Sequence, residues 1–229
     1  MIVSVFLRGW EDLFRPGALK IVGLGVALSL GLFVALYFAL LWVMGWVLPD
    51  TITLPWIGTV TWLRTAADWA TLGLMMFASM FLMVPVASAF TGFFLEDVAE
   101  LVEKEHYPSL PEVRQLSFLE GLGDTLRFFG VIIVANLLAL MIYPFVIPFA
   151  PLLFFGMNGY LLGREYFQMA SLRRMDRGAA RALYERNRAT VWATGALMAL
   201  PLSIPVLNLV VPVVGAAAFT HLFHRLARR

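Results

Sequence analysis

Cysteine is absent from the 229-residue sequence, and charged residues are scarce. Without cysteine the chain has no disulfide, no thiolate metal site and no cysteine nucleophile. Charged residues make up 14% of the chain, against roughly 25% in soluble domains. The formal net charge of +2 does not provide the strongly basic face that nucleic-acid binding needs. No GxxxxGK[ST] loop is present, so we expect neither ATPase chemistry nor a bound cofactor.

Hydrophobic residues make up 61% of the chain and gather in long runs. A helix needs about 20 apolar residues to cross the roughly 30 Å hydrocarbon core of a bilayer. The run 21–48 has no charged residue and predicts a first transmembrane helix. Segment 69–104 predicts a second, whose amphipathic end beyond residue 91 continues out of the membrane as a cytoplasmic extension. Residues 51–68 predict a short loop between the two helices.

Two further apolar regions, 128–163 and 189–224, are each interrupted by three prolines. Their uninterrupted pieces Leu152–Gly163 and Val191–Leu200 have 12 and 10 residues and cover roughly 15–18 Å, about half of the hydrocarbon core. We therefore expect two re-entrant, hemi-penetrating helical hairpins. Their tips are expected to be buried in protein or to line a water-filled path, because unpaired peptide groups are costly in lipid.

Positive charge is distributed unevenly along the chain. Segment 164–188 carries seven arginines and three acidic residues, residues 1–20 carry three basic residues, and the 51–68 loop carries one. Cytoplasmic segments of membrane proteins hold the excess of lysine and arginine, so we expect both termini and segment 164–188 in the cytoplasm. The expected fold is an all-α, single membrane domain over residues 1–229, with two long transmembrane helices and two hairpins.

A series of short motifs runs through almost the whole chain. They are Gly9-Trp10, Arg15-Pro16-Gly17, Pro85-Val86-Ala87, Phe90-Thr91-Gly92, Gly195-Ala196-Leu197, Ile204-Pro205-Val206-Leu207-Asn208-Leu209, Pro212 and Gly215-Ala216. In this order they resemble the CysZ sulfate-transporter family of bacterial inner-membrane proteins. The resemblance implies the helix arrangement described above, a multi-pass protein of the inner membrane and a homo-oligomer. It also implies sulfate uptake for assimilation without an ATPase domain.

The same resemblance implies an anion site at the start of the first long helix. In the family a Gly-Leu-Arg-type motif follows a Pro-Gly step, whereas this chain has a lysine one place later. Free N–H groups at a helix N-terminus attract anions, and lysine adds a point charge rather than a bidentate fork. A plain helix start, anchored by its charges at the membrane surface, is the alternative. The residues expected to contact sulfate or a related inorganic anion are Arg15, Pro16, Gly17, Ala18, Leu19 and Lys20.

Polar residues beside the proline-broken regions are candidates for lining a pathway, since broken helices at membrane depth mark substrate paths in many transporters. These candidates are Asn158, Arg164, Glu165 and Asn208. The asparagines can equally hydrogen-bond to other helices or cap broken ends. The two charged residues can equally anchor the chain at the membrane interface. The arginines of segment 164–188 serve as a topology signal and contact anionic lipids, or else concentrate anions.

Two histidines, His221 and His224, lie three residues apart near the C-terminus. No HExxH motif accompanies them, so we interpret them as interfacial and expect no metal site. No GxSxG motif and no paired intramembrane carboxylates are present, which disfavours an enzyme. Three functions stay open: passage of sulfate or a similar anion, transport of a different small solute, and a non-transporting scaffold or lipid-interacting role.

Overall fold

A computed structural model describes residues 1–47, 52–54, 58–60, 62–92, 94–111 and 149–228, together with Val134, Leu137, Leu138 and Met141. The helices are α1 (Ile2–Leu13), α2 (Pro16–Val47), α3 (Trp62–Gly92), α4 (Leu95–His106), α6 (Ala150–Leu172), α7 (Arg177–Leu202), α8 (Pro205–Asn208) and α9 (Val211–Ala227). The strands are β1 (Ile52–Leu54) and β2 (Gly58–Val60). Much of the first half of the expected hairpin 128–163, with Pro144 and Pro148, lies outside the described residues.

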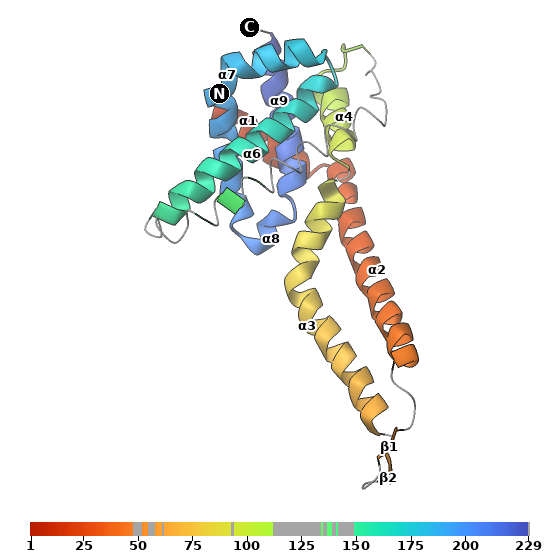
Figure 1. Ribbon diagram of the computed structural model, residues 1–229. Coiled ribbons are helices and arrows are strands. Elements are labelled where there is room, and N and C mark those ends of the chain that lie inside the picture. Colours follow the sequence, from red (N-terminus) through yellow and green to blue (C-terminus); the bar gives the residue numbers. More distant parts are fainter. Residues whose placement is uncertain are drawn as a thin grey trace.

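Helices α2 and α3 lie side by side and project away from the remaining helices (Figure 1). Small residues bring the two helices close, because a Cβ atom at Gly25 would meet the side chain of Thr91 and lie 3.0 Å from the Ala87 carbonyl oxygen. At the far end, where we expected only a loop, β1 and β2 form an antiparallel pair with Ile52 opposite Val60.

Helix α2 is the one helix in the described part of the chain that is long and apolar enough to cross a bilayer. Its most apolar window has a mean hydropathy of 2.4, and only 11% of that window is buried within the protein. Large side chains such as Phe38 and Trp42 are exposed on it. The core helix of a soluble protein would bury such side chains, so the exposed apolar surface supports a location in the membrane.

The remaining helices surround α9, which is the most deeply buried element. Each of its residues from Val211 to His224 is buried, and α1, α4, α6 and α7 all contact it (Figure 1). Glycines let these helices approach closely. The Tyr166 ring of α6 lies over Gly215, where a Cβ atom would come within 2.7 Å of the ring. Helix α9 therefore joins elements from both ends of the chain into one core.

The expected continuous helix over 69–104 is wrong in one respect, because the chain forms two helices there. Helix α3 ends at Gly92 and α4 begins at Leu95. Phe94 between them has φ −103° and ψ 18°, outside the α-helical region. The break has a physical reason: it lets α4 turn its apolar stripe of Val98, Ala99 and Val102 into the core around α9.

Helices α6 and α7 pack as a close antiparallel pair. A Cβ atom at Gly195 would clash with the Gly159 carbonyl and come within 2.6 Å of the Gly163 nitrogen. The indole N–H of Trp192 donates to the Gly156 carbonyl at 3.0 Å. Between the helices the chain turns at Asp176, whose carboxylate caps α7 by accepting from Gly178 N–H and Ala179 N–H at 2.8 and 3.0 Å.

Helix α6 continues past Gly163 without a break. Helix α7 also extends beyond the short piece that the sequence suggests, but it is kinked at Asn187, where φ is −118° and ψ is 16°. At the other end α7 stops at Leu202 and the chain turns through α8 into α9 (Figure 1). The tip of this turn exposes apolar side chains, with Ile204 and Val206 at 50% and 74%. We expected this tip to be buried in protein or to line a water-filled path; the described part of the chain does not bury it.

We predict that Gly195→Ala destabilises the pairing of α6 and α7, because the added methyl group meets backbone atoms that cannot move aside. Overpacking of this kind costs about 1–3 kcal/mol. The midpoint of thermal unfolding in mild detergent measures the effect. Gly156→Ala is the matched control, because a Cβ atom at Gly156 of α6 has no neighbour within 4 Å. Equal midpoints for both variants would contradict the close packing.

Candidate functional site

The predicted anion-binding segment lies where α1 passes into α2. Pro16 is the first residue of α2, which suits proline because its missing N–H has no role there. The N–H groups of Gly17 and Ala18 have no acceptor within the helix. A cavity of about 210 Å³ lies beside them, bordered by α1, α4 and α9. Leu19 is exposed and is not among the residues that line this cavity.

Arg15 is held by two carboxylates at the mouth of this cavity. Its Nε–H donates to Asp12 Oδ1 at 2.8 Å, and its terminal nitrogen lies 2.7 Å from Glu105 Oε1. The hydrogen bonds that Arg15 donates to Glu105 and Asp12 raise the pKa of Arg15 above its usual value, and burial offsets part of this rise. The positive charge predicted to attract an anion is therefore largely neutralised within the protein.

Lys20 has a different environment, one helical turn further along α2. It is exposed and lines a second groove of about 450 Å³, together with Asp97, Glu100 and Lys104 of α4. Lys104 forms an ion pair with Glu100. Lys20 makes no ion pair with any residue that the structure describes, so its charge is available to a ligand.

The candidate pathway residues lie apart from the helix start. The Asn158 amide donates to the Phe154 carbonyl of its own helix at 2.9 Å, as an asparagine with a structural role does. Arg164 donates to the Tyr160 hydroxyl at 3.1 Å, and Glu165 is half-buried beside it on α6. Asn208 ends α8. None of these four lines either of the two cavities at the start of α2.

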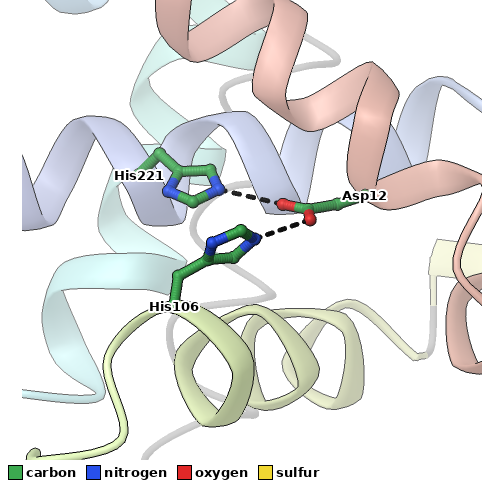
Figure 2. Close-up of side chains that lie close together, drawn as sticks. All are labelled: Asp12, His106 and His221. Carbon is green, nitrogen blue, oxygen red and sulfur yellow. Dashed lines mark hydrogen bonds and ion pairs between the residues drawn. The ribbon is translucent and has the colours of Figure 1, made fainter.

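Figure 2 shows a polar cluster of Asp12, His106 and His221 that the sequence did not predict. Asp12 and His221 are buried, whereas His106 is exposed. Asp12 of α1 lies between two imidazole rings: His221 Nε2–H donates to Oδ2 at 2.9 Å and His106 Nε2–H to Oδ1 at 2.8 Å. A carboxylate can only accept, so in the neutral His221 ring Nδ1 accepts from the Tyr107 hydroxyl, at 2.9 Å. The interpretation of His221 as interfacial is wrong, since its side chain is fully buried.

A second buried carboxylate lies one turn further along α9. Glu103 of α4 accepts from His224 Nε2–H at 3.0 Å. It also accepts two hydrogen bonds from Arg174, at 2.9 and 2.7 Å, and one from Arg173 at 3.3 Å. His224 is therefore buried as well, and not interfacial. Four hydrogen bonds from three residues saturate this carboxylate, as a buried charge requires.

Both carboxyl groups have a pKa well below the usual value. Burial raises the pKa of Asp12, but the hydrogen bonds and charges of His221 and His106 outweigh it, and the pKa falls from 3.8 to about 2. For Glu103 burial also acts to raise the pKa. The hydrogen bonds of His224 and Arg174 and the charges of both arginines overcome it, and the pKa falls from 4.5 to about 2. The two groups are ionised at neutral pH.

The sequence contains a pattern that indicates the burial of Asp12 and Glu103. Asp12 falls in register with the buried Val5, Gly9 and Leu13 of α1. Glu103 likewise falls on the buried stripe of α4. An acidic residue at helical spacing within an apolar stripe indicates a buried, partnered charge. The identity of the partners was not predictable, because they lie on distant helices.

The trio of Asp12, His106 and His221 also has the composition of a metal site, with donor atoms within 4.8 Å of one another. The donors, however, already bond to one another, and the Arg15 guanidinium lies 2.8 Å from Asp12. A divalent cation would have to approach this fixed positive charge and break both histidine bonds. We therefore interpret the trio as a hydrogen-bonded cluster that holds α1, α4 and α9 together.

Comparison with known proteins bears on this arrangement. The profile of the family described as sulfate transporter CysZ/etoposide-induced protein 2.4 matches residues 5–212. The chain belongs to this family. A search of curated proteins finds no match. As a member of the CysZ/etoposide-induced protein 2.4 family, the chain falls in a transporter-type family of membrane proteins.

The family match covers both carboxylates and the start of α2, but it ends at residue 212. His221 and His224, which bond the two carboxylates, lie beyond it. The match therefore does not extend to the pairing of α9 with α1 and α4, for which the tertiary structure is the evidence.

We predict that the protein becomes less stable as the pH is lowered, because the two buried carboxylates are then protonated. A lowered pKa in the folded state means that the stabilisation is complete above pH 4.5 and is lost as the pH falls toward 2. Each group contributes about 2–3 kcal/mol. Unfolding midpoints in detergent between pH 6 and 2 measure the loss.

Glu103→Gln removes one of the two titrating groups, so its midpoint depends less steeply on pH than that of the unmodified protein. Glu96→Gln, at an exposed acid of the same helix, is the matched control and keeps the original slope. If Glu103→Gln also kept the original slope, the acid sensitivity would have another origin.

Proposed function

We propose that the protein passes a small inorganic anion, with sulfate as the first candidate, across the inner membrane of a bacterium. The family match over residues 5–212 carries this proposal, because the family description names a sulfate transporter. The exposed apolar surface of α2 supports a place in the membrane. The energy would come from a gradient or from consumption of the solute, since the chain has no nucleotide-binding loop.

The proposed topology places both termini in the cytoplasm. The N- and C-terminal ends lie at the same end of the molecule as α7, while α2 and α3 extend to the opposite end (Figure 1). Arginines are concentrated at the α7 end, as expected for a cytoplasmic surface. In this proposal α2 and α3 are the two long spans, and the regions 128–163 and 189–224 enter the membrane as hairpins of a homo-oligomer.

The proposed anion site is the start of α2, between the two cavities that Gly17 borders. The N–H groups of Gly17 and Ala18 and the unpaired charge of Lys20 would contact the anion. Asp12 and Glu105 outweigh Arg15 in the first cavity, and Asp97 and Glu100 offset Lys20 and Lys104 in the second. The site as a whole carries no net positive charge, so we expect it to bind an anion only weakly. Weak binding suits conduction, because a solute that binds too tightly does not leave.

We predict that purified protein in liposomes supports uptake of radiolabelled sulfate, and that Lys20→Gln raises the sulfate concentration for half-maximal flux about threefold to tenfold, as expected when a charge-assisted contact is lost. Lys104→Gln is the matched control. It removes the same charge from the same groove, but from a lysine already paired with Glu100, so its effect is smaller.

Thermal unfolding of each variant shows that the protein remains folded, and excess chloride tests the selectivity. Flux indistinguishable from that of empty liposomes, with folded protein, would reject sulfate passage. It would leave another solute or a non-transporting scaffold. Equal effects of the two lysine variants would reject Lys20 as a contact while leaving sulfate passage intact.

A further inference from the structure

A wide groove lies between α6 and α7, away from the start of α2. Its volume is about 600 Å³. The arginines that line it are Arg164, Arg177, Arg181 and Arg188, and Glu185 is the one acidic residue among its lining residues. Arg181 pairs with Glu185 at 3.2 Å, so the lining residues carry a clear excess of positive charge. Such a site favours an anionic ligand.

The groove is not purely polar. Phe167, Leu172 and Ala180 line it as well, and the rings of Tyr160 and Tyr184 stand at its walls. Tyr160 accepts a hydrogen bond from Arg164 at 3.1 Å, which fixes that guanidinium at the rim. Arg188, on the other wall, is exposed and makes no ion pair with the described residues. A ligand with both an anionic and an apolar part matches this lining.

The surface of the α6–α7 pair changes character along its length. At one end Leu152 of α6 and Phe149 just before it are exposed, as are Leu200 of α7 and Val206 of α8. At the other end lie the arginines of the groove. Gly159 packs on Ala196 and Gly163 on Val191, so the apolar halves of the two antiparallel helices lie at the same end.

Exposed aromatic residues, Tyr160 on α6 and Trp192 on α7, mark the boundary between the two halves. Tyrosine and tryptophan prefer the level of the lipid headgroups. If the apolar half enters the bilayer, the arginine groove lies at the headgroup level on the cytoplasmic side. Guanidinium groups match phosphate oxygens in pairs, and cytoplasmic leaflets carry the anionic lipids.

We propose that the groove between α6 and α7 binds the phosphate headgroup of an anionic phospholipid and so seats the hairpin pair in the inner leaflet. The proposal uses residues that play no part in the sulfate site. It therefore holds or fails independently of sulfate passage.

The test measures dissociation constants of short-chain phosphatidylglycerol and phosphatidylcholine for the full-length protein in neutral detergent, by native mass spectrometry. We expect phosphatidylglycerol to bind at least tenfold more tightly. Arg188→Gln should weaken the binding of phosphatidylglycerol about fivefold, because one arginine near an anionic surface contributes about that factor to the affinity. Arg164→Gln, on the opposite wall, should do the same.

Arg186→Gln is the matched control. It removes the same charge two residues from Arg188 on the same helix, at an exposed position that does not line the groove. We expect a change of less than twofold. Equal losses for Arg186→Gln and Arg188→Gln, or equal binding of the two lipids, would overturn the proposal.

Competition with inorganic phosphate distinguishes an anionic lipid from a free anion as the ligand of the groove. We expect it to displace phosphatidylglycerol only at concentrations far above those of the lipid, because it lacks the apolar part. Displacement at comparable concentrations would overturn the lipid assignment in favour of a soluble phosphate-bearing ligand.

Discussion

Two buried carboxylates determine how the helices of this protein meet. Asp12 on α1 and Glu103 on α4 each bond to a histidine of α9, and these histidines lie one helical turn apart. Removing a charge from water costs several kcal/mol unless the charge is fully partnered. The partners come from α4 and α9, from Arg15 between α1 and α2, and from the two arginines that follow α6. The arrangement of α1, α4 and α9 described here satisfies both charges.

This arrangement also sets the position and charge of the proposed anion site. Asp12 precedes Pro16, the first residue of α2, by one helical turn, so the same carboxylate that holds α9 also bonds Arg15. The charge of Arg15, the arginine nearest to the start of α2, is therefore paired within the protein. Lys20 keeps an available charge because it lies one turn further along, on the exposed face of α2. A structural cluster and a candidate binding site thus share one residue.

The close pairing of α6 and α7 has a comparable role at the other side of the molecule. Glycines at the contact let the backbones approach. Small residues have the same role between helices in lipid, where van der Waals packing rather than the hydrophobic effect drives association. The pair then exposes apolar side chains at one end and arginines at the other. A single packing contact therefore produces both an exposed apolar tip and a basic groove at the other end of the pair.

The amino-acid sequence alone was sufficient for the features that depend on local composition. The uncharged run after Lys20 indicates an apolar helix, because a bilayer-crossing helix needs only length and hydropathy. The ordered motifs indicated the family, and the match over residues 5–212 confirmed it. The sequence analysis missed the break at Phe94. Gly92 stands beside the break, but glycine also occurs inside transmembrane helices, and the amphipathic pattern continues past residue 91 at helical spacing.

Only the tertiary structure decided which charges are paired. Asp12 bonds partners that lie 94 and 209 residues away in the chain, and no periodicity relates such positions. His221 and His224 therefore looked like interfacial residues, whereas burial against α1 and α4 makes them part of the core. Local patterns report whether a helix forms and which face is apolar. The pairing of buried charges depends on which helices meet, and that is a property of the whole fold.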